Sequence, residues 1–421
     1  MPELPKLSRG SPELPSEVAL PATPTETDLL AEIRLEAGRL GFSRLGVAPA
    51  SKPPHHDALT KWLAAGLAGV MGDWLGRHEP LRRDPAAVLP GVKSIVMLAT
   101  DHDRGRTVSG EQLSAGAGRV ARYARGDDYH APLRHRLNAL ATWLESRVPG
   151  SHARGVVDSA PLAERDFGWL AGLGWFGKNT MLIDPRAGSY FLLSALLTDI
   201  PLPADVPIET DHCGTCTACL DACPTGALPQ PRLLDATKCI SALTIEDHGP
   251  IAPALRAGMG DWIFGCDICQ EVCPWNRYAT GSADPVFQPR GGEDPLDLAG
   301  LLALDEAGFR DRFRGSPILR AKRRGLLRSA AIALGNRPHP PAFPTLVEAL
   351  ADAEPAVRGA AAWCLGRWLT AGVMTEQVRT ILGSRREVET EPDVIAELRQ
   401  ALEDQVSSMS PDGSRPGPSS P

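Results

Sequence analysis

Eight of the nine cysteines in this 421-residue chain fall between residues 213 and 273. Four follow the spacing C-x2-C-x2-C-x3-C and precede a proline, as in one half of a bacterial-type ferredoxin. The other four are a single cysteine, a gap of 26 residues, and a C-x2-C-x3-C run that again precedes proline. Two sets of four thiolates predict two 4Fe–4S clusters. The sets are Cys213, Cys216, Cys219 and Cys223, then Cys239, Cys266, Cys269 and Cys273.

The last cysteine of each run is expected to cross over, because in two-cluster ferredoxins it ligates the other cluster. One cluster would then be held by Cys213, Cys216, Cys219 and Cys273, and the other by Cys239, Cys266, Cys269 and Cys223. Structural zinc and disulfides are the alternative uses of these thiols. A zinc ribbon needs neither the third and fourth cysteine of the run nor the proline, and we see no secretory signal that would favour disulfides.

Composition is that of an ordinary globular protein, with 43% hydrophobic and 23% charged residues. The length suggests two to four domains. No apolar run approaches the roughly 18 residues of a membrane span, so we expect no membrane association. Oxygen-sensitive clusters and reduced thiols, with no secretory signal in view, predict a cytoplasmic location. The net charge of −7 argues against a uniformly basic nucleic-acid binder but leaves room for a local basic patch.

The first half of the chain predicts an α+β domain over residues 27–205, since helical and strand patterns mix without regular alternation. Proline-rich segments at 1–26 and 407–421 are expected to be disordered. Lys93 to Ala99 is a continuous apolar run typical of a central strand. The other expected helices are 28–40, 133–148 and 162–172, and the other expected strands are 42–47, 154–158 and 190–197.

The C-terminal part has an almost wholly helical pattern over residues 315–405. Two segments, 326–336 and 356–368, each begin near an arginine, run through small residues and include Leu-Gly. Their spacing of about 31 residues predicts helix-pair repeats of HEAT type, which usually serve as docking surfaces. Cys364, the ninth cysteine, lies in the second segment and is expected to be a small core residue.

Asp158 is the strongest candidate for proton transfer, because it ends an expected strand where a loop begins. The alternative is that Asp158 only caps the following helix. After that helix, the glycines of residues 172–180 could let the backbone approach a large flat cofactor, although the spacing matches no nucleotide-binding loop.

A basic stretch at residues 310–328 has eight positive charges against one negative charge. It could bind phosphate, as in an RNA contact, or it could be a solvated helix face. Its basic residues are Arg310, Arg312, Arg314, Arg320, Lys322, Arg323, Arg324 and Arg328.

Six runs together resemble epoxyqueuosine reductase, and the resemblance extends in order over residues 28 to 400. The runs are YARGDDYH (123–130), VDSAPLAER (157–165), AGLGWFGKNT (171–180), CGTCTACLDACPTGAL (213–228), CISALT (239–244) and GCDICQEVCPWN (265–276). Two positions depart from the family pattern. Asp127 stands where a basic residue is expected, and Ser194-Ala195 where an acidic residue is expected.

The resemblance implies a cobalamin-dependent enzyme with two iron–sulfur clusters. Such an enzyme reduces epoxyqueuosine to queuosine at the wobble position of tRNA anticodons, the last step of queuosine synthesis. It implies a cobalamin-binding domain related to reductive dehalogenases over 27–205, a ferredoxin-like domain over 206–290, and a HEAT-like domain over 291–406. Its partners would be epoxyqueuosine-containing tRNA and an external low-potential electron donor, and a monomer is expected.

The resemblance also implies roles for single residues. Asp158 would be the catalytic proton donor, and we expect burial beside the cofactor to raise its pKa. The positions that match cobalamin contacts are Arg82, Ala121, Asp158, Lys178, Leu182, Leu193, Ser241 and Asp267.

Two other functions are weighed against this one. Reductive dehalogenases also use cobalamin and two clusters, but they typically carry an export signal and lack a HEAT-like tail. A simple electron carrier would leave about 200 N-terminal residues and Asp158 without a role.

Overall fold

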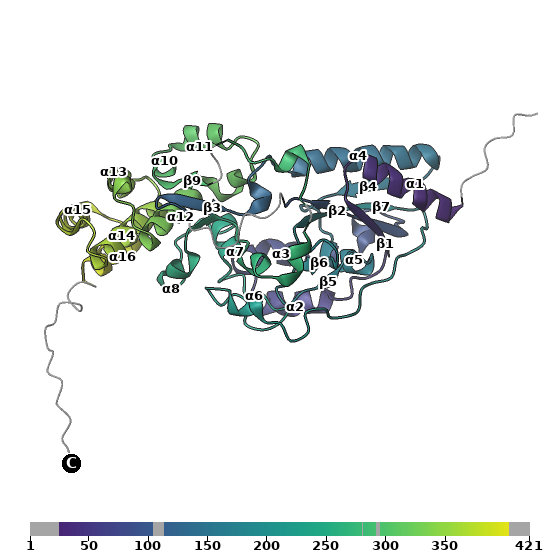
Figure 1. Ribbon diagram of the computed structural model, residues 1–421, viewed down its shortest axis with the longest axis horizontal. Helices are drawn as coiled ribbons and strands as arrows, with labels where there is room; N and C mark the ends of the chain where they lie inside the picture. The colour runs from purple at the N-terminus through teal and green to yellow at the C-terminus, as the bar shows by residue number, and fades with distance from the viewer. Residues whose placement is uncertain (1–24, 104–112, 280, 292–294, 404–421) are drawn as a thin grey trace, which may run out of the picture.

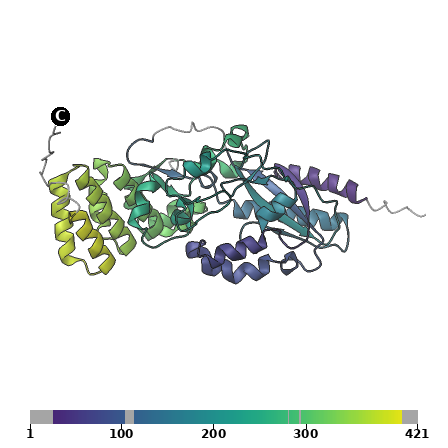
Figure 2. The ribbon, with the colours of Figure 1, turned by 90° about the horizontal axis from the view of Figure 1, so that it is seen from below.

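The structure is a computed structural model, and it describes residues 25–103, 113–279, 281–291 and 295–403. The two terminal segments expected to be disordered lie almost wholly outside these ranges. Figures 1 and 2 show an elongated molecule, with a sheet and its helices at one end, a stack of helices at the other, and the cysteine region between them. Over the described ranges, no helix combines the length and the apolarity that a bilayer crossing requires.

The first sheet is fully antiparallel and has the strand order β1-β2-β7-β4. The central strand β2 is buried on both faces, which explains the continuous apolar run in its sequence. Val96 and Leu98 face one core, and Ile95 and Met97 face the other. The strands are β1 (Arg44–Pro49), β2 (Ser94–Asp101), β4 (Ala153–Val156) and β7 (Phe191–Thr198).

Helices cover both faces of this sheet. The side chains of α1 (Glu26–Arg39) and α4 (His130–Arg147) pack on the face of Val96. The opposite face is covered by α5 (Glu164–Leu170), whose Phe167 is fully buried. Two further helices, α2 (His56–Ala64) and α3 (Gly72–Arg82), precede β2, and a two-stranded ribbon, β5 (Trp175–Phe176) with β6 (Leu182–Ile183), follows α5.

A second sheet joins segments that lie far apart in the sequence. Its centre is β3 (Ala117–Val120), which runs parallel to β8 (Trp262–Phe264) and antiparallel to β9 (Leu296–Asp297). A strand from the predicted cobalamin domain therefore lies in the sheet of the cysteine region. The short helices of that region are α6 (Ala218–Asp221), α7 (Ile240–Ile245), α8 (Pro253–Arg256) and α9 (Ile268–Glu271).

One hydrophobic core extends from this second sheet into the C-terminal helices, so no core boundary falls at residue 290. The domain limits given from the sequence stay predictions. The fold class itself, mixed α+β followed by helical repeats, is confirmed. The C-terminal helices are α10 (Leu298–Leu302), α11 (Glu306–Arg312), α12 (Lys322–Asn336), α13 (Phe343–Ala349), α14 (Pro355–Thr370), α15 (Thr375–Val388) and α16 (Pro392–Glu403).

The two similar segments form α12 and α14, which pack against each other. Trp368 donates its indole N–H to the carbonyl of Leu334 at 2.9 Å, and Cys364 is completely buried, as expected of a core residue. The glycine of each Leu-Gly pair gives room to the next helix. A Cβ on Gly335 would lie 3.0 Å from the Cα of Cys364, and a Cβ on Gly366 would lie 2.9 Å from the Cα of Ala401.

Gly366→Ala should therefore lower the thermal unfolding midpoint of the repeat helices. The added methyl would push α14 from α16, at a cost of about 1–3 kcal/mol that outweighs the helix-propensity gain of alanine over glycine. Gly359→Ala in the same helix is the matched control, because its Cβ would meet only Glu397 at 3.6 Å. Circular dichroism should give opposite shifts for the two variants, and equal shifts would contradict this account of the packing.

Candidate active site

The eight clustered thiols surround two separate cavities. Cys213, Cys216, Cys219 and Cys273 line one, and Cys223, Cys239, Cys266 and Cys269 line the other. All nine cysteines lie within the described ranges, and none forms a disulfide. In those ranges no three His, Cys, Asp or Glu side chains converge as around a single metal ion. The two groups are those that crossing of the last cysteines predicts, while the ligand assignment itself stays a prediction.

The second thiol group is set in apolar surroundings. Burial raises the pKa of the Cys266 and Cys269 thiols above the usual range of a thiol. At neutral pH these groups would keep their protons unless a metal centre displaced them. Cys223 also accepts a hydrogen bond at its sulfur from the backbone N–H of Ala227 at 3.3 Å. Such a donor set fits an iron–sulfur cluster, whose sulfur ligands are often hydrogen-bonded.

The cavity beside these thiols has a volume of about 370 Å³ and a mostly apolar lining. The imidazole of His102 lines it, and its Nδ1 has no hydrogen-bond partner in the described part of the chain. Burial and the charge of Arg122 lower the pKa of His102 to about 3, so the ring is neutral. An apolar space with an unpaired polar atom on its wall fits a large, flat organic cofactor.

Six of the eight positions expected to contact cobalamin border this space or the cavity next to it. Ala121, Ser241 and Asp267 line the larger cavity. Asp158, Leu182 and Leu193 line a neighbouring cavity of about 180 Å³, which shares four lining residues with it: Arg165, Met181, Phe191 and Leu192.

The structure does not bring the other two positions to this space. Arg82 donates to the carbonyl of Leu162 at 2.7 Å, behind the loop of Asp158. Lys178 lines the cavity of the first thiol group and donates to the carbonyls of Gly214 and Cys216.

Asp158 lies just after β4, with its carboxylate 60% exposed in the smaller cavity. It accepts hydrogen bonds from Nε2 of His130 at 2.9 Å and from the hydroxyl of Tyr129 at 3.3 Å. It does not cap α5, whose N-cap is Ala163. Instead Glu164, in the first turn of α5, accepts the backbone N–H of Asp158 at 2.8 Å. The φ of Asp158 is +51°, in the left-handed region that aspartate enters more readily than most side chains but at some cost.

We expected burial to raise the pKa of Asp158, but in the structure this pKa is lowered. The hydrogen bond from His130 lowers that pKa and outweighs the opposing effect of desolvation. Hydrogen bonds to Asp128 and Asp158 in turn raise the pKa of His130 to about 9. At neutral pH the pair is therefore an aspartate beside an imidazolium. Burial, followed by the charge of Asp158, raises the pKa of Glu164 to about 8.

Sequence reasoning assigned no role to Asp128, Tyr129 or His130, although all three belong to the run YARGDDYH. The available signal was three polar or aromatic side chains together at the start of a helix. Asp127 in the same run forms an ion pair with Arg290 at 2.7 Å.

The glycines of residues 172–180 serve the chain itself. A Cβ on Gly174 would lie 2.4 Å from the carbonyl oxygen of Ile183, and one on Gly177 would lie 2.4 Å from the Ile183 side chain. These two glycines let β5 and β6 approach each other. The sequence had suggested instead that they let the backbone approach a cofactor. Asn179 and Thr180, which follow them, do line the larger cavity.

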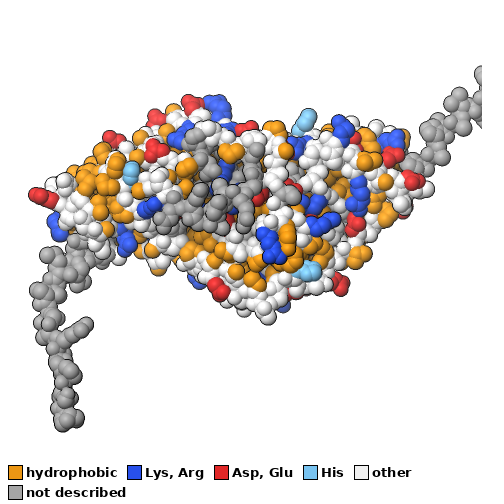
Figure 3. Space-filling view, in the orientation of Figure 1, with side chains coloured by type: hydrophobic (Ala, Val, Ile, Leu, Met, Phe, Trp, Pro, Cys, Tyr) orange, Lys and Arg blue, Asp and Glu red, His pale blue; other side chains and the backbone are white. Residues whose placement is uncertain are grey.

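The basic stretch 310–328 divides into buried and exposed side chains. Arg328 is 1% exposed and donates to the carbonyls of Leu243 and Asp247. Arg323 pairs with Asp352, and Arg310 pairs with Glu306 at 2.8 Å. On the face in Figure 3, basic and acidic side chains are interspersed. Arg310, Arg314 and Arg320 are 72%, 79% and 59% exposed, each in an ion pair, so a phosphate contact of this stretch stays a prediction. Arg320 pairs with Glu246, and its charge adds to the effect of His130 on the pKa of Asp158.

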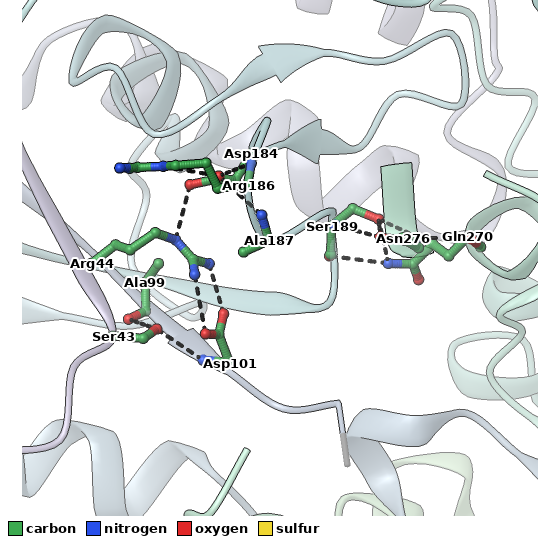
Figure 4. Close-up of polar contacts among 10 residues, drawn as sticks. All are labelled: Ser43, Arg44, Ala99, Asp101, Asp184, Arg186, Ala187, Ser189, Gln270 and Asn276. Carbon is green, nitrogen blue, oxygen red and sulfur yellow. Dashed lines mark hydrogen bonds and ion pairs between the residues drawn. The ribbon is translucent and has the colours of Figure 1, made fainter. Parts of the chain in front are cut away.

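Two polar networks fix the loop 184–189 between the first sheet and the cysteine region (Figure 4). In one, Arg44 binds Asp101 at 2.6 Å and Asp184 at 3.1 Å. In the other, Asn276 accepts the backbone N–H of Ser189 at 2.7 Å and donates to the carbonyl of Gln270 at 2.7 Å. The second network, which we call the Asn276 clamp, holds the segment after Cys273 against the sheet.

Comparison with known proteins agrees with these features. A family model of a 4Fe-4S double cluster binding domain matches residues 212–276, one of epoxyqueuosine reductase QueG matches 82–159, and one of HEAT repeats matches 317–405. An epoxyqueuosine reductase of Pseudomonas aeruginosa is 42% identical over 326 residues, which cover 77% of this chain and 90% of that protein. The chain belongs to the epoxyqueuosine reductase family.

Solved structures of the epoxyqueuosine reductase family superpose along most of the chain. One, in complex with an epoxyqueuosine-modified stem loop of tRNA-Tyr, has a TM-score of 0.82 at 31% identity and covers 90% of this chain and 99% of its own. Another, from Bacillus subtilis, has its catalytic aspartate loop swung out of the active site; its TM-score is 0.81 at 31% identity, with the same coverage. A reductive dehalogenase gives a TM-score of only 0.37, so that relation stays a prediction.

Asn276→Ala should loosen the Asn276 clamp, because the buried N–H of Ser189 loses its acceptor at a cost of about 1–3 kcal/mol. We expect a lower thermal midpoint and faster amide hydrogen exchange around Ser189. Asn138→Ala, at an exposed position of α4, is the control. Unchanged exchange at residues 188–190 in Asn276→Ala would show that the clamp does not hold this loop.

Proposed function

We propose that this protein reduces epoxyqueuosine to queuosine at the wobble position of tRNA anticodons, with electrons that pass through two 4Fe–4S clusters to cobalamin. Membership of the family and the tRNA stem loop bound to a solved relative support the substrate. The observation that carries the proposal is the position of Asp158. Its carboxylate lies in a cavity that shares walls with the space beside Cys223, Cys239, Cys266 and Cys269.

The proposed clusters follow the crossed grouping of thiols. The group with exposed Cys216 would hold the cluster nearer to solvent, where an external low-potential donor can deliver electrons. The group with Cys269 would hold the cluster beside the larger cavity. A cluster transfers one electron at a time, so two successive transfers are required for each epoxide reduced.

The proposed cobalamin would occupy the larger cavity and, when bound, would supply electrons to the substrate carbon. Ala121, Ser241 and Asp267 would contact it there, with Leu182 and Leu193 on the side of Asp158. Arg82 and Lys178 stay in the proposed contact set. They would reach the cofactor only where it extends past these two cavities.

Asp158 is proposed as the acid that protonates the departing oxygen. Opening of the epoxide places negative charge on oxygen, and a carboxyl proton delivered there removes the need to form a free alkoxide. Three features suit Asp158 to this role. Its side chain is 60% exposed towards an incoming substrate, its backbone is held by Glu164, and a relative of known structure has a catalytic loop at an aspartate.

The direct test incubates the purified protein with epoxyqueuosine-containing tRNA, cobalamin and a low-potential reductant, followed by nucleoside mass analysis. The expected product is queuosine, lighter than the substrate nucleoside by one oxygen atom. Persistence of the epoxide with fully loaded protein would refute the proposed function. A reaction that proceeds equally without cobalamin would refute the cofactor.

Cys269→Ala should remove about half of the bound iron, because one of two clusters loses a ligand. Cys364→Ala is the matched control, since that thiol is completely buried in α14 away from both cavities. Iron analysis and electron paramagnetic resonance of anaerobically purified protein measure the effect. Equal iron in the two variants would argue against the assigned ligands.

Asp158→Asn should keep iron and cobalamin at wild-type levels and lower turnover by about 10²–10⁴-fold, the usual contribution of a positioned acid. The amide is similar in size but carries no transferable proton. Asp57→Asn, at an exposed ion pair with Lys52, should retain full turnover. A wild-type rate for Asp158→Asn would remove this residue from the mechanism.

A further inference from the structure

His130, the first residue of α4, is held between two carboxylates. Its Nδ1 lies 2.6 Å from Oδ1 of Asp128, and its Nε2 lies 2.9 Å from Oδ2 of Asp158. The ring stacks on Tyr129 at a centroid distance of 4.2 Å, and its side chain is 31% exposed. A neutral imidazole has one donor only, whereas both carboxylates accept. Only the imidazolium satisfies the two contacts together, so the geometry stores a proton next to Asp158.

The proposed reaction needs such a store, because reduction of an epoxide to an alkene consumes two electrons and two protons. The first proton joins the oxygen as one carbon–oxygen bond breaks. The second joins the resulting hydroxyl, which leaves as water while the electrons complete the double bond. The resting pair of an Asp158 carboxylate and a His130 imidazolium holds one transferable proton, so Asp158 must be charged twice in each turnover. The second charge requires that the partly exposed His130 ring takes up a proton from solvent between the two steps.

We propose that His130 recharges Asp158: its Nε2 proton passes to the Asp158 carboxylate, and Asp128 keeps the ring in the orientation that allows this. After the transfer His130 is a neutral imidazole that still donates from Nδ1 to Asp128. Its Nε2 then takes a proton from solvent, which restores the imidazolium for the second transfer to Asp158. This inference rests on the proposed function and deepens it. His130 and Asp128 are positioning residues, since they act on the substrate through Asp158.

The charged and titratable groups around this relay come from several elements. Asp128 and Arg134 interact with His130 or its partner at the start of α4, and Tyr129, whose ring stacks on that of His130, donates to Asp158. Arg320, in the 3-10 turn just before α12, interacts with Asp158 through its charge, as do Arg82 and Glu164. Glu164 is the competing proton source, but its carboxylate faces the backbone N–H of Asp158 and not the side chain.

The alkaline limb of the pH–rate profile tests the relay, because activity is lost when the carrier of the proton is deprotonated. In the wild type that limb should lie near the His130 pKa of about 9. In His130→Gln, Asp158 holds the proton alone, and the limb should move down by at least roughly two pH units, towards the range of a carboxylic acid. Turnover at pH 8 should fall by about 10²-fold and recover at lower pH.

His135→Gln, at an exposed position of the same helix, should keep the wild-type profile. Glu164→Gln preserves the acceptor for the Asp158 backbone and should leave the limb in place. A limb that moves in Glu164→Gln but not in His130→Gln would overturn the proposal in favour of Glu164. An unchanged limb in His130→Gln would overturn it at any absolute rate.

Asp128→Asn keeps the contact of His130 with Asp158 and removes the strongest cause of its raised pKa. Its limb should move towards lower pH by about one unit. If His130→Gln has no activity at any pH, the profile of Asp128→Asn tests the relay in its place. An alkaline limb at the wild-type position in Asp128→Asn would then overturn the relay. Absence of any conversion by the wild type would instead refute the proposed function and leave no limb to compare.

A second readout needs no cobalamin and no turnover. Nitrogen-15 histidine labelling of the full chain should show one imidazole that titrates near pH 9, assigned by its absence from His130→Gln. The same signal should titrate at lower pH in Asp128→Asn. A His130 signal that titrates near the usual histidine pKa of about 6.5 would overturn the stored proton.

Discussion

The buried residue Arg122 ties the first-sheet part of the molecule to the cysteine region at the larger cavity. Its side chain is 9% exposed, donates to Asp103 at 2.7 Å, and lies 4.7 Å above the ring of Tyr190. Its backbone N–H donates to Asp267 at 2.8 Å. A buried charge that loses its partner costs several kcal/mol, so these groups cannot separate without loss of the fold. Because Asp267 lies between Cys266 and Cys269, this constraint sets the thiols against the end of the first sheet.

Buried arginines with polar partners also join the repeat helices to the cysteine region. Arg328 of α12 reaches three carbonyls around α7, and Arg256 of α8 forms a bidentate pair with Glu397 of α16. Arg328, which the sequence places within a basic run, is here a buried donor to backbone carbonyls. This arrangement explains why the repeats share one core with the second sheet. It also leaves Arg320, paired but exposed, as the contribution of the repeats to the charge near Asp158.

Local pattern was sufficient for much of the fold and for the grouping of the thiols. The strand around Met97 and the helix around Leu137 are long and regular enough for their period to identify them. Sequence pattern could not predict the pairing of β3 with β8, because it joins segments more than a hundred residues apart and only Arg119 and Val120 of the four-residue β3 take part. The basic run left a phosphate contact and a solvated face both open for a related reason: a one-dimensional charge count cannot separate a solvated arginine from one like Arg328 that donates to buried carbonyls.

The sign of the Asp158 pKa shift shows most clearly where sequence reasoning ends. Burial alone raises the pKa of a carboxyl, and that was the expectation. The outcome depends on whether an imidazole lies within hydrogen-bond distance, which no pattern in the run around His130 specifies. The pair is partly exposed, so it adds little to stability and separates at small cost. The left-handed φ of Asp158 has a conformational cost of about 1–3 kcal/mol. The hydrogen bond from its backbone N–H to Glu164 helps to offset that cost. The loop is therefore held by its backbone while its carboxylate stays free to exchange partners, as an acid that must give up and regain a proton requires.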